Sequence, residues 1–185
     1  MTPRRSTRLS RDDWLAAGIK VLADRGADAL KAEPLARHLQ TTKGSFYWHF
    51  TDVPAFHEVL LTRWEETATD EMARLLEATH TPVARLRELA QAIAEPRWQP
   101  GAASVEASIR AWSTVNDTAR AAVERVDAAR LAQLRALLSE TGIGNPEMAS
   151  ILHGAAIGMA MQGAGAETDR RAAIGSLVDL VLALR

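Results

Sequence analysis

The segment at residues 41–50 decides how the N-terminal part of this chain folds, and it reads Thr41-Thr42-Lys43-Gly44-Ser45-Phe46-Tyr47-Trp48-His49-Phe50. A short amphipathic stretch, Glu33 to Leu39, precedes it across a turn-like break. Two short helices joined by a tight turn form a helix-turn-helix, whose second helix presents its exposed face to DNA. The segment therefore predicts a DNA-binding head at the start of the chain.

The second helix of such a head needs small residues at its start, so that the backbone can approach DNA, and donors that reach phosphates and base edges. We expect these DNA contacts from Thr42, Lys43, Gly44, Ser45, Tyr47 and His49. Thr42 can also cap the helix. Phe46 and Phe50 are better placed as core anchors, whereas Trp48 fits the groove and the core equally well.

Charge is divided unevenly along the chain. Residues 1–51 hold 9 Lys and Arg against 5 Asp and Glu, a net charge of +4, and the remainder holds 13 against 18, a net charge of −5. This asymmetry favours a polyanionic partner for the head, although small charge differences are common. Three arginines near the N-terminus could enter an adjacent minor groove or could belong to a solubilising tail: Arg4, Arg5 and Arg8.

The composition indicates an all-α protein. Hydrophobic residues make up 47% of the 185 residues, Ala and Leu are abundant, and β-branched residues rarely cluster. Cys is absent, which excludes disulfides and thiolate metal sites and fits a reducing cytoplasm. No apolar run reaches the ~18 residues of a membrane span, and the basic N-terminus lacks the apolar core of a signal peptide. We therefore expect a cytoplasmic protein with no membrane partner.

Caps, breaks and apolar periodicity predict nine helices and no strand. Their approximate ranges are 10–25, 32–39, 43–49, 53–78, 81–94, 102–115, 118–140, 146–163 and 168–184. Asp52 and Pro54 restart the chain after the head, which predicts two domains, a DNA-binding domain over 1–51 and a helical ligand-binding and dimerisation domain over 52–185.

The segment Leu35-Ala36-Arg37-His38-Leu39-Gln40-Thr41-Thr42-Lys43-Gly44-Ser45-Phe46-Tyr47-Trp48-His49-Phe50 resembles the DNA-binding signature of the TetR family of bacterial transcriptional regulators. The spacing of Trp14, Gly26 and Ala29-Leu30 is similar as well, so the resemblance covers residues 10–60. It implies a homodimer that represses transcription by binding an operator. It also implies release when a small molecule enters the C-terminal domain, and no cofactor.

Three residues depart from the family pattern. Gln40 occupies the position of a turn Gly, so it must adopt a left-handed conformation or the turn must differ. Lys31 replaces a capping Thr or Ser, which removes the cap and could add a phosphate contact. Thr51 stands where a Lys is common, which removes one potential phosphate contact.

Two C-terminal segments are apolar on nearly every side, which predicts that each packs on its own core and on a partner. The residues that we expect at the dimer interface are Ile151, Ala155, Gly158, Leu177 and Val181. The family resemblance implies a four-helix bundle across a two-fold axis, and a larger monomeric core is the alternative. A two-fold dimer places two heads about 34–36 Å apart, so the operator should be a near-palindrome.

A ligand pocket is predicted in the C-terminal domain for an apolar or aromatic effector with one polar handle. The candidate residues are Trp98, Val105, Ile109, Trp112, His153 and Met159. Trp112 could equally be a core residue and His153 a satisfied interface histidine. Arg110 is expected to pair with Glu106, its neighbour one helical turn away.

Other functions receive less support. The chain has no Cys nucleophile, Gly-rich phosphate loop or paired metal-ligand His motif, which argues against an enzyme. A helical interaction protein that binds no DNA would not explain the basic head. Within the DNA-binding interpretation, an activator without small-molecule release is an alternative to a repressor.

Overall fold

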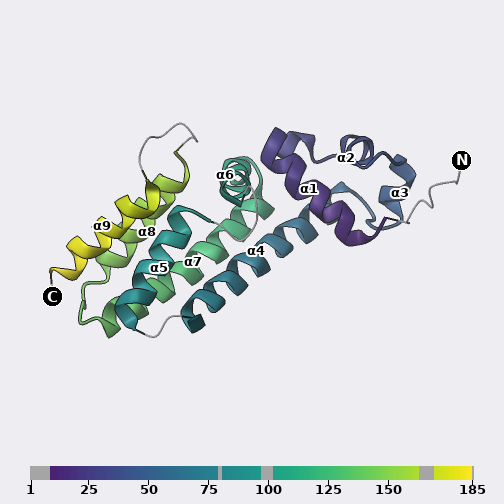
Figure 1. The fold of residues 1–185 in the computed structure, drawn as a ribbon. Helices are drawn as coiled ribbons and strands as arrows, with labels where there is room; N and C mark the ends of the chain where they lie inside the picture. The colour runs from purple at the N-terminus through teal and green to yellow at the C-terminus, as the bar shows by residue number, and fades with distance from the viewer. Residues whose placement is uncertain (1–8, 79–80, 97–101, 163–168, 185) are drawn as a thin grey trace, which may run out of the picture. The chain divides into compact units, whose positions relative to one another are not determined.

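The computed structural model describes residues 9–78, 81–96, 102–162 and 169–184, which form two compact units, Met1–Arg63 and Trp64–Arg185. Arg4, Arg5, Arg8 and Trp98 lie outside the described residues. Every regular element in the described part of the chain is helical, as Figure 1 shows, which confirms the predicted all-α class.

The helices of the first unit are α1 (Arg11–Arg25), a short 3-10 helix η1 (Ala27–Ala29), α2 (Ala32–His38), α3 (Lys43–Tyr47) and the start of α4 (Val53–Ala78). The second unit holds the rest of α4 with α5 (Pro82–Ala94), α6 (Ala102–Ser113), α7 (Asp117–Glu140), α8 (Glu147–Ala160) and α9 (Arg170–Leu182). Each predicted helix has its counterpart. However, α3 ends at Tyr47 rather than at His49, and η1 was not predicted.

Local caps explain where several helices begin and end. Ser10 forms a capping box with Asp13, because the Asp13 N–H donates to the Ser10 hydroxyl and the Ser10 N–H donates back to the carboxylate. Gly26 ends α1 with a positive φ of 74°, a conformation that glycine adopts without steric cost. Thr81 and Asn116 accept the first free amides of α5 and α7.

An aromatic cluster forms the core of the first unit. Phe46 is fully buried, with its ring edge-on to Trp14 and to Phe56 at centroid distances of 5.4 Å. Phe50 is also buried and lies 4.9 Å from Phe56. Because α3 has only five residues, these anchors rather than its own hydrogen bonds hold it in place. Both residues are core anchors, as predicted.

Helix α5 is central to the second unit, since it packs against α7, α8 and α9 (Figure 1). Helix α8 also packs against α7 and α9, and α6 packs mainly on α7. The buried apolar residues of α5, α7, α8 and α9 form one continuous core. Among the described residues, no helix is both long enough and apolar enough to cross a lipid bilayer.

Candidate nucleic-acid interface and ligand cavity

The turn between α2 and α3 depends on Gln40, which has a φ of 53°. This left-handed conformation costs a residue with a Cβ about 1–2 kcal/mol. It lets the Thr41 N–H donate to the Ala36 carbonyl at 2.9 Å, so that the end of α2 is satisfied. The expectation of a left-handed Gln40 is thus confirmed, and the helix-turn-helix keeps a tight turn without glycine.

The start of α3 combines a cap with an open surface. The Ser45 N–H donates to the Thr42 hydroxyl at 3.3 Å, so Thr42 is the predicted N-cap. Lys43 is exposed, and its ammonium lies 5.9 Å from the centre of the Tyr47 ring. The one atom within 4 Å of a Cβ added at Gly44 is the Thr42 hydroxyl, at 3.8 Å. The backbone here is therefore open to a close approach.

Aromatic side chains continue this surface at the end of α3. Tyr47 is 46% exposed and Trp48 is 80% exposed, so Trp48 does not join the core. His49 is half-buried beside Phe50. Both rings therefore belong to the exposed surface at the end of α3.

The flanking residues behave in different ways. Lys31 is exposed and occupies the N-cap of α2 without a side-chain hydrogen bond to the helix, as the missing Thr or Ser predicted. Thr51 is exposed next to the Asp52 cap of α4. Arg11 lies over the Phe50 ring at 5.3 Å, a cation–π contact that was not predicted.

The second unit contains a cavity of about 60 Å³ between α4, α5, α7 and α9. Its apolar walls are Ala68, Met72, Leu75, Leu89, Ala92, Ile93 and Pro96. Four charged side chains also line it, namely Glu71, Glu95, Arg130 and Arg171. The helical spacing of the apolar residues in α4 and α5 is visible in the sequence, but nothing in that spacing distinguishes a cavity wall from a filled core.

None of the predicted pocket residues that the structure describes is among the residues that line this cavity. Val105, Ile109 and Trp112 are buried along α6, and Met159 packs half-buried against the core of the unit. His153 is buried on α8 and faces a network of charges.

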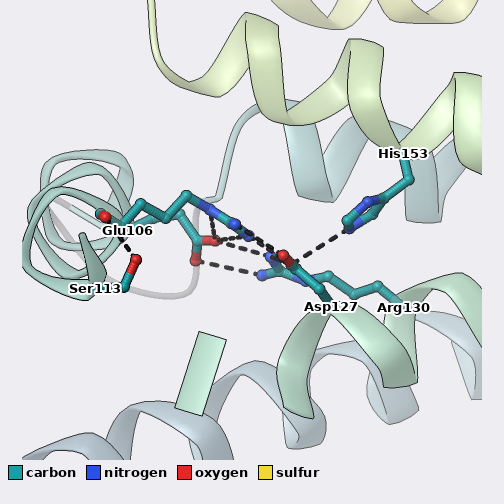
Figure 2. A network of polar contacts seen from close by, with 6 residues as sticks. Glu106, Ser113, Asp127, Arg130 and His153 are labelled. Carbon is teal, nitrogen blue, oxygen red and sulfur yellow. Dashed lines mark hydrogen bonds and ion pairs between the residues drawn. The ribbon is translucent and has the colours of Figure 1, made fainter. Parts of the chain in front are cut away.

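This network joins α6, α7 and α8 (Figure 2). Glu106 is only 1% exposed and accepts hydrogen bonds from Arg130 Nη1 at 2.8 Å and Arg110 Nε at 2.9 Å. Arg110 also binds both oxygens of Asp127, at 2.6 and 2.9 Å. His153 Nε2 lies 3.4 Å from Asp127 Oδ1. The predicted Arg110–Glu106 pair is confirmed as one part of this larger arrangement.

The network keeps both carboxylates ionised. Burial works to raise the pKa of Glu106, but Arg130 and Arg110 outweigh it and hold the pKa below its ordinary value. Burial likewise works to raise the pKa of Asp127, but the hydrogen bonds from Arg110, together with His153 close by, outweigh burial and hold the pKa well below its ordinary value. The two arginines and two carboxylates compensate each other, as buried charges require.

The residues predicted for the dimer interface divide into two groups. Ile151 (48% exposed) and Gly158 are exposed, and Ala155 and Leu177 are half-buried. Val181 is buried in the core of its own unit instead. Apart from the backbone of α8 itself, no described residue has an atom within 4 Å of a Cβ added at Gly154 or Gly158, so this face of α8 is open within the described part of one protomer. On α9, Leu180 is 67% exposed.

Comparisons with known proteins agree with this architecture. Residues 15–52 match the model of bacterial regulatory proteins of the tetR family. By sequence, no curated protein matches the chain. Several solved structures share the fold at low sequence identity. A transcriptional regulator from Saccharomonospora viridis in complex with choline is 16% identical, with a TM-score of 0.77 over 94% of this chain and 95% of that chain.

Two further structures carry the same fold. The transcriptional regulator FadR from Bacillus subtilis in complex with stearoyl-CoA is 15% identical, with a TM-score of 0.72 over 94% of this chain and 98% of that chain. A TetR transcription regulator from Haloarcula marismortui is 14% identical, with a TM-score of 0.73 over 94% of this chain and 96% of that chain. Residues 15–52 therefore match the model of the tetR family of bacterial regulatory proteins, and the chain as a whole has the fold of the TetR-family transcriptional regulators among these structures.

Proposed function

We propose that this protein is a homodimeric repressor that binds a near-palindromic operator and leaves it when a small molecule enters the second unit. The observation that carries the proposal is the surface of α3, where the capped, open helix start at Thr42–Ser45 is followed by exposed Tyr47 and Trp48. These groups supply donors for phosphates and large faces for a groove. Because DNA is the proposed partner, we propose that the protein acts in the cytoplasm.

The open face of α8 supports a homodimer. Ile151, Gly154 and Gly158 follow a helical spacing on one side, and the exposed Leu180 of α9 adds apolar surface. Glycines without neighbours within 4 Å allow a second helix to approach closely. Such a face is stabilised by burial against a second copy, and two-fold symmetry is the commonest solution.

Two of the similar structures support control by an effector. The regulator from Saccharomonospora viridis was solved in complex with choline, and FadR was solved in complex with stearoyl-CoA. Ligands of such different chemistry show that this fold accommodates diverse small molecules. The cavity between α4, α5, α7 and α9 is the candidate site in this chain.

The test is fluorescence anisotropy with labelled DNA from upstream of the protein's own gene, measured at two salt concentrations with competitor DNA. Specific binding should weaken steeply as salt rises, because phosphate contacts release counterions. The matched control is a probe of the same composition with one half-site scrambled. Equal affinity for both probes would contradict sequence-specific binding by a two-fold dimer.

A further inference from the structure

Arg130 lies at the boundary between the cavity and the charge network. Arg130 is one of the residues that line the cavity, and its side chain is 8% exposed. In the part of the chain that the structure describes, Arg130 donates hydrogen bonds only to Glu106, at 2.8 and 3.4 Å. A guanidinium has five N–H donors, so donors remain for a ligand in the cavity.

A second arginine at the cavity has donors to spare as well. Arg171 binds Glu88 at 3.1 Å and Gln91 at 2.8 Å, both through Nη2. Its Nε and Nη1 have no hydrogen-bond acceptor among the described residues. Two arginines therefore line one cavity, and arginine binds a carboxylate through paired hydrogen bonds.

The two acidic residues of the cavity do not favour a cation. Glu71 already pairs with Arg74 at 3.5 Å, and Glu95 is not free of partners. No described residue of the lining is aromatic, so the cavity offers no ring to a quaternary ammonium group. The remaining described walls are aliphatic or sulfur-containing, represented by Met72, Leu89 and Ile93, and these fit a hydrocarbon body.

The volume indicates how much of a ligand the cavity can enclose. One water molecule needs about 10–15 Å³ of such space. A cavity of about 60 Å³ therefore accommodates roughly four to six non-hydrogen atoms, the size of a short-chain carboxylate.

We propose that the cavity of the second unit binds a short-chain aliphatic carboxylate, with the hydrocarbon against α4 and α5 and the carboxylate on Arg130 and Arg171. This proposal rests on the proposed function, because it specifies the chemical class of the effector. The carboxylate competes with Glu106 for Arg130, and so it links the cavity to α6 through the network of Figure 2.

The probe is butyrate, titrated into the full-length protein without DNA and followed by isothermal titration calorimetry. Butyramide tests for the charge, because it keeps the shape and removes the negative charge, and choline tests the opposite charge. We expect one butyrate per chain, with butyramide and choline at least about tenfold weaker, the loss expected for a charged hydrogen bond. Equal binding of butyramide, tighter binding of choline, or no binding of butyrate or propionate would overturn the proposal.

Variants of the Glu106–Arg130 pair test the position of the carboxylate. Arg130→Gln combined with Glu106→Gln replaces the ion pair by two amides and leaves Arg110 with Asp127. This double variant should bind butyrate about tenfold more weakly, whereas Glu106→Gln alone should bind it more tightly because it frees Arg130. Arg135→Gln, an exposed change on the same helix, is the matched control. Thermal melting of each variant shows whether it is folded.

Unchanged affinity in the double variant, or weaker binding in Glu106→Gln, would overturn the placement on Arg130. Because the calorimetry uses no DNA, a failure of the carboxylate site can be distinguished from a failure of the proposed DNA-binding function. Butyrate binding without operator binding would contradict the proposed function and leave the site in place. Operator binding without butyrate binding would contradict the site and leave the regulator in place.

Discussion

Glu106 on α6 and Arg130 on α7 form an ion pair at 2.8 Å in the interior of the second unit, where both side chains are at least nine-tenths buried. Breaking such a pair by removing one partner costs about 3–5 kcal/mol, because the other charge is left buried and uncompensated. Here Arg110 on α6 donates hydrogen bonds to both Glu106 and Asp127, so the network as a whole holds α6 against α7.

This network predicts how stability depends on pH. The pKa values of Glu106 and Asp127 lie below their ordinary values in the folded protein, so in acid the unfolded chain binds more protons. Their contribution is therefore complete above about pH 5 and is lost as pH falls from about 4 through the folded pKa values. Urea unfolding at a series of pH values, followed by Trp fluorescence, should show this decline.

The variant Glu106→Gln should unfold with a smaller pH dependence below about pH 4, because one shifted carboxylate is gone. Glu140→Gln removes an exposed carboxylate from the end of α7 and is the control, with little change in the slope. If Glu106→Gln and the original protein lose stability equally between pH 4 and 3, the network is not the source of the acid sensitivity.

The network also shows how far the sequence predicts this structure. Glu106 and Arg110 are one helical turn apart, so their pairing was predicted, and helix ends marked by Ser10 or Gly26 were predicted from local signals too. Arg130 is 24 residues from Glu106, and the folding of α6 against α7 brings them together. Contacts at that separation depend on packing angles, which hydrophobic periodicity does not specify.

The same limit applies to the cavity. Val105 and Ile109 share an apolar helix face, which predicted a pocket wall; both are buried, and neither is among the residues that line the cavity. Helical spacing shows which side of a helix is buried, but whether the opposing side chains leave a gap depends on their combined volume. The exposed side of α3 was more predictable, because α3 is short and its neighbours are close in sequence.

Gln40 offers a direct test of strain in the recognition turn. Because its φ of 53° disfavours any residue with a Cβ, Gln40→Gly should stabilise the protein. The expected gain is up to about 1 kcal/mol after the entropy that glycine adds to the unfolded chain. Gln40→Ala keeps the Cβ and is the control, which should show no gain. Urea unfolding measures the free energy of unfolding of both variants. Equal stability of the two variants would show that the turn carries no strain at this residue.

Lys43 should contribute to operator binding without affecting the fold. It is exposed at the start of α3, so we expect Lys43→Ala to remove a DNA contact and no core packing. A lost phosphate contact lowers the salt dependence of binding by about one unit of log–log slope, and a lost guanine contact costs about 1–3 kcal/mol for that base pair. Fluorescence anisotropy at several salt concentrations distinguishes a lost phosphate contact from a lost guanine contact.

The control for this change is Lys20→Ala, which removes the same charge from an exposed position on α1. Its affinity should fall far less than that of Lys43→Ala. Equal losses in both variants would show that the head attracts DNA through its overall charge, and that α3 does not make the specific contact.

Gly158 tests the open face of α8. Within one protomer a Cβ at this position meets no atom within 4 Å, so Gly158→Leu should leave the fold and the melting of the isolated chain intact. Across a close helix–helix contact, a leucine side chain would push the two copies apart, since overpacking typically costs about 1–3 kcal/mol. Because a two-fold interface contains the residue twice, dimerisation should weaken by at least tenfold, as measured by sedimentation equilibrium.

Gly144→Leu makes the same change at an open position in the loop before α8 and should leave the dimer unchanged. A Gly158→Leu protein that dimerises as well as the Gly144→Leu protein would remove this face of α8 from the interface, and the exposed apolar residues of α9 around Leu180 would become the next surface to vary.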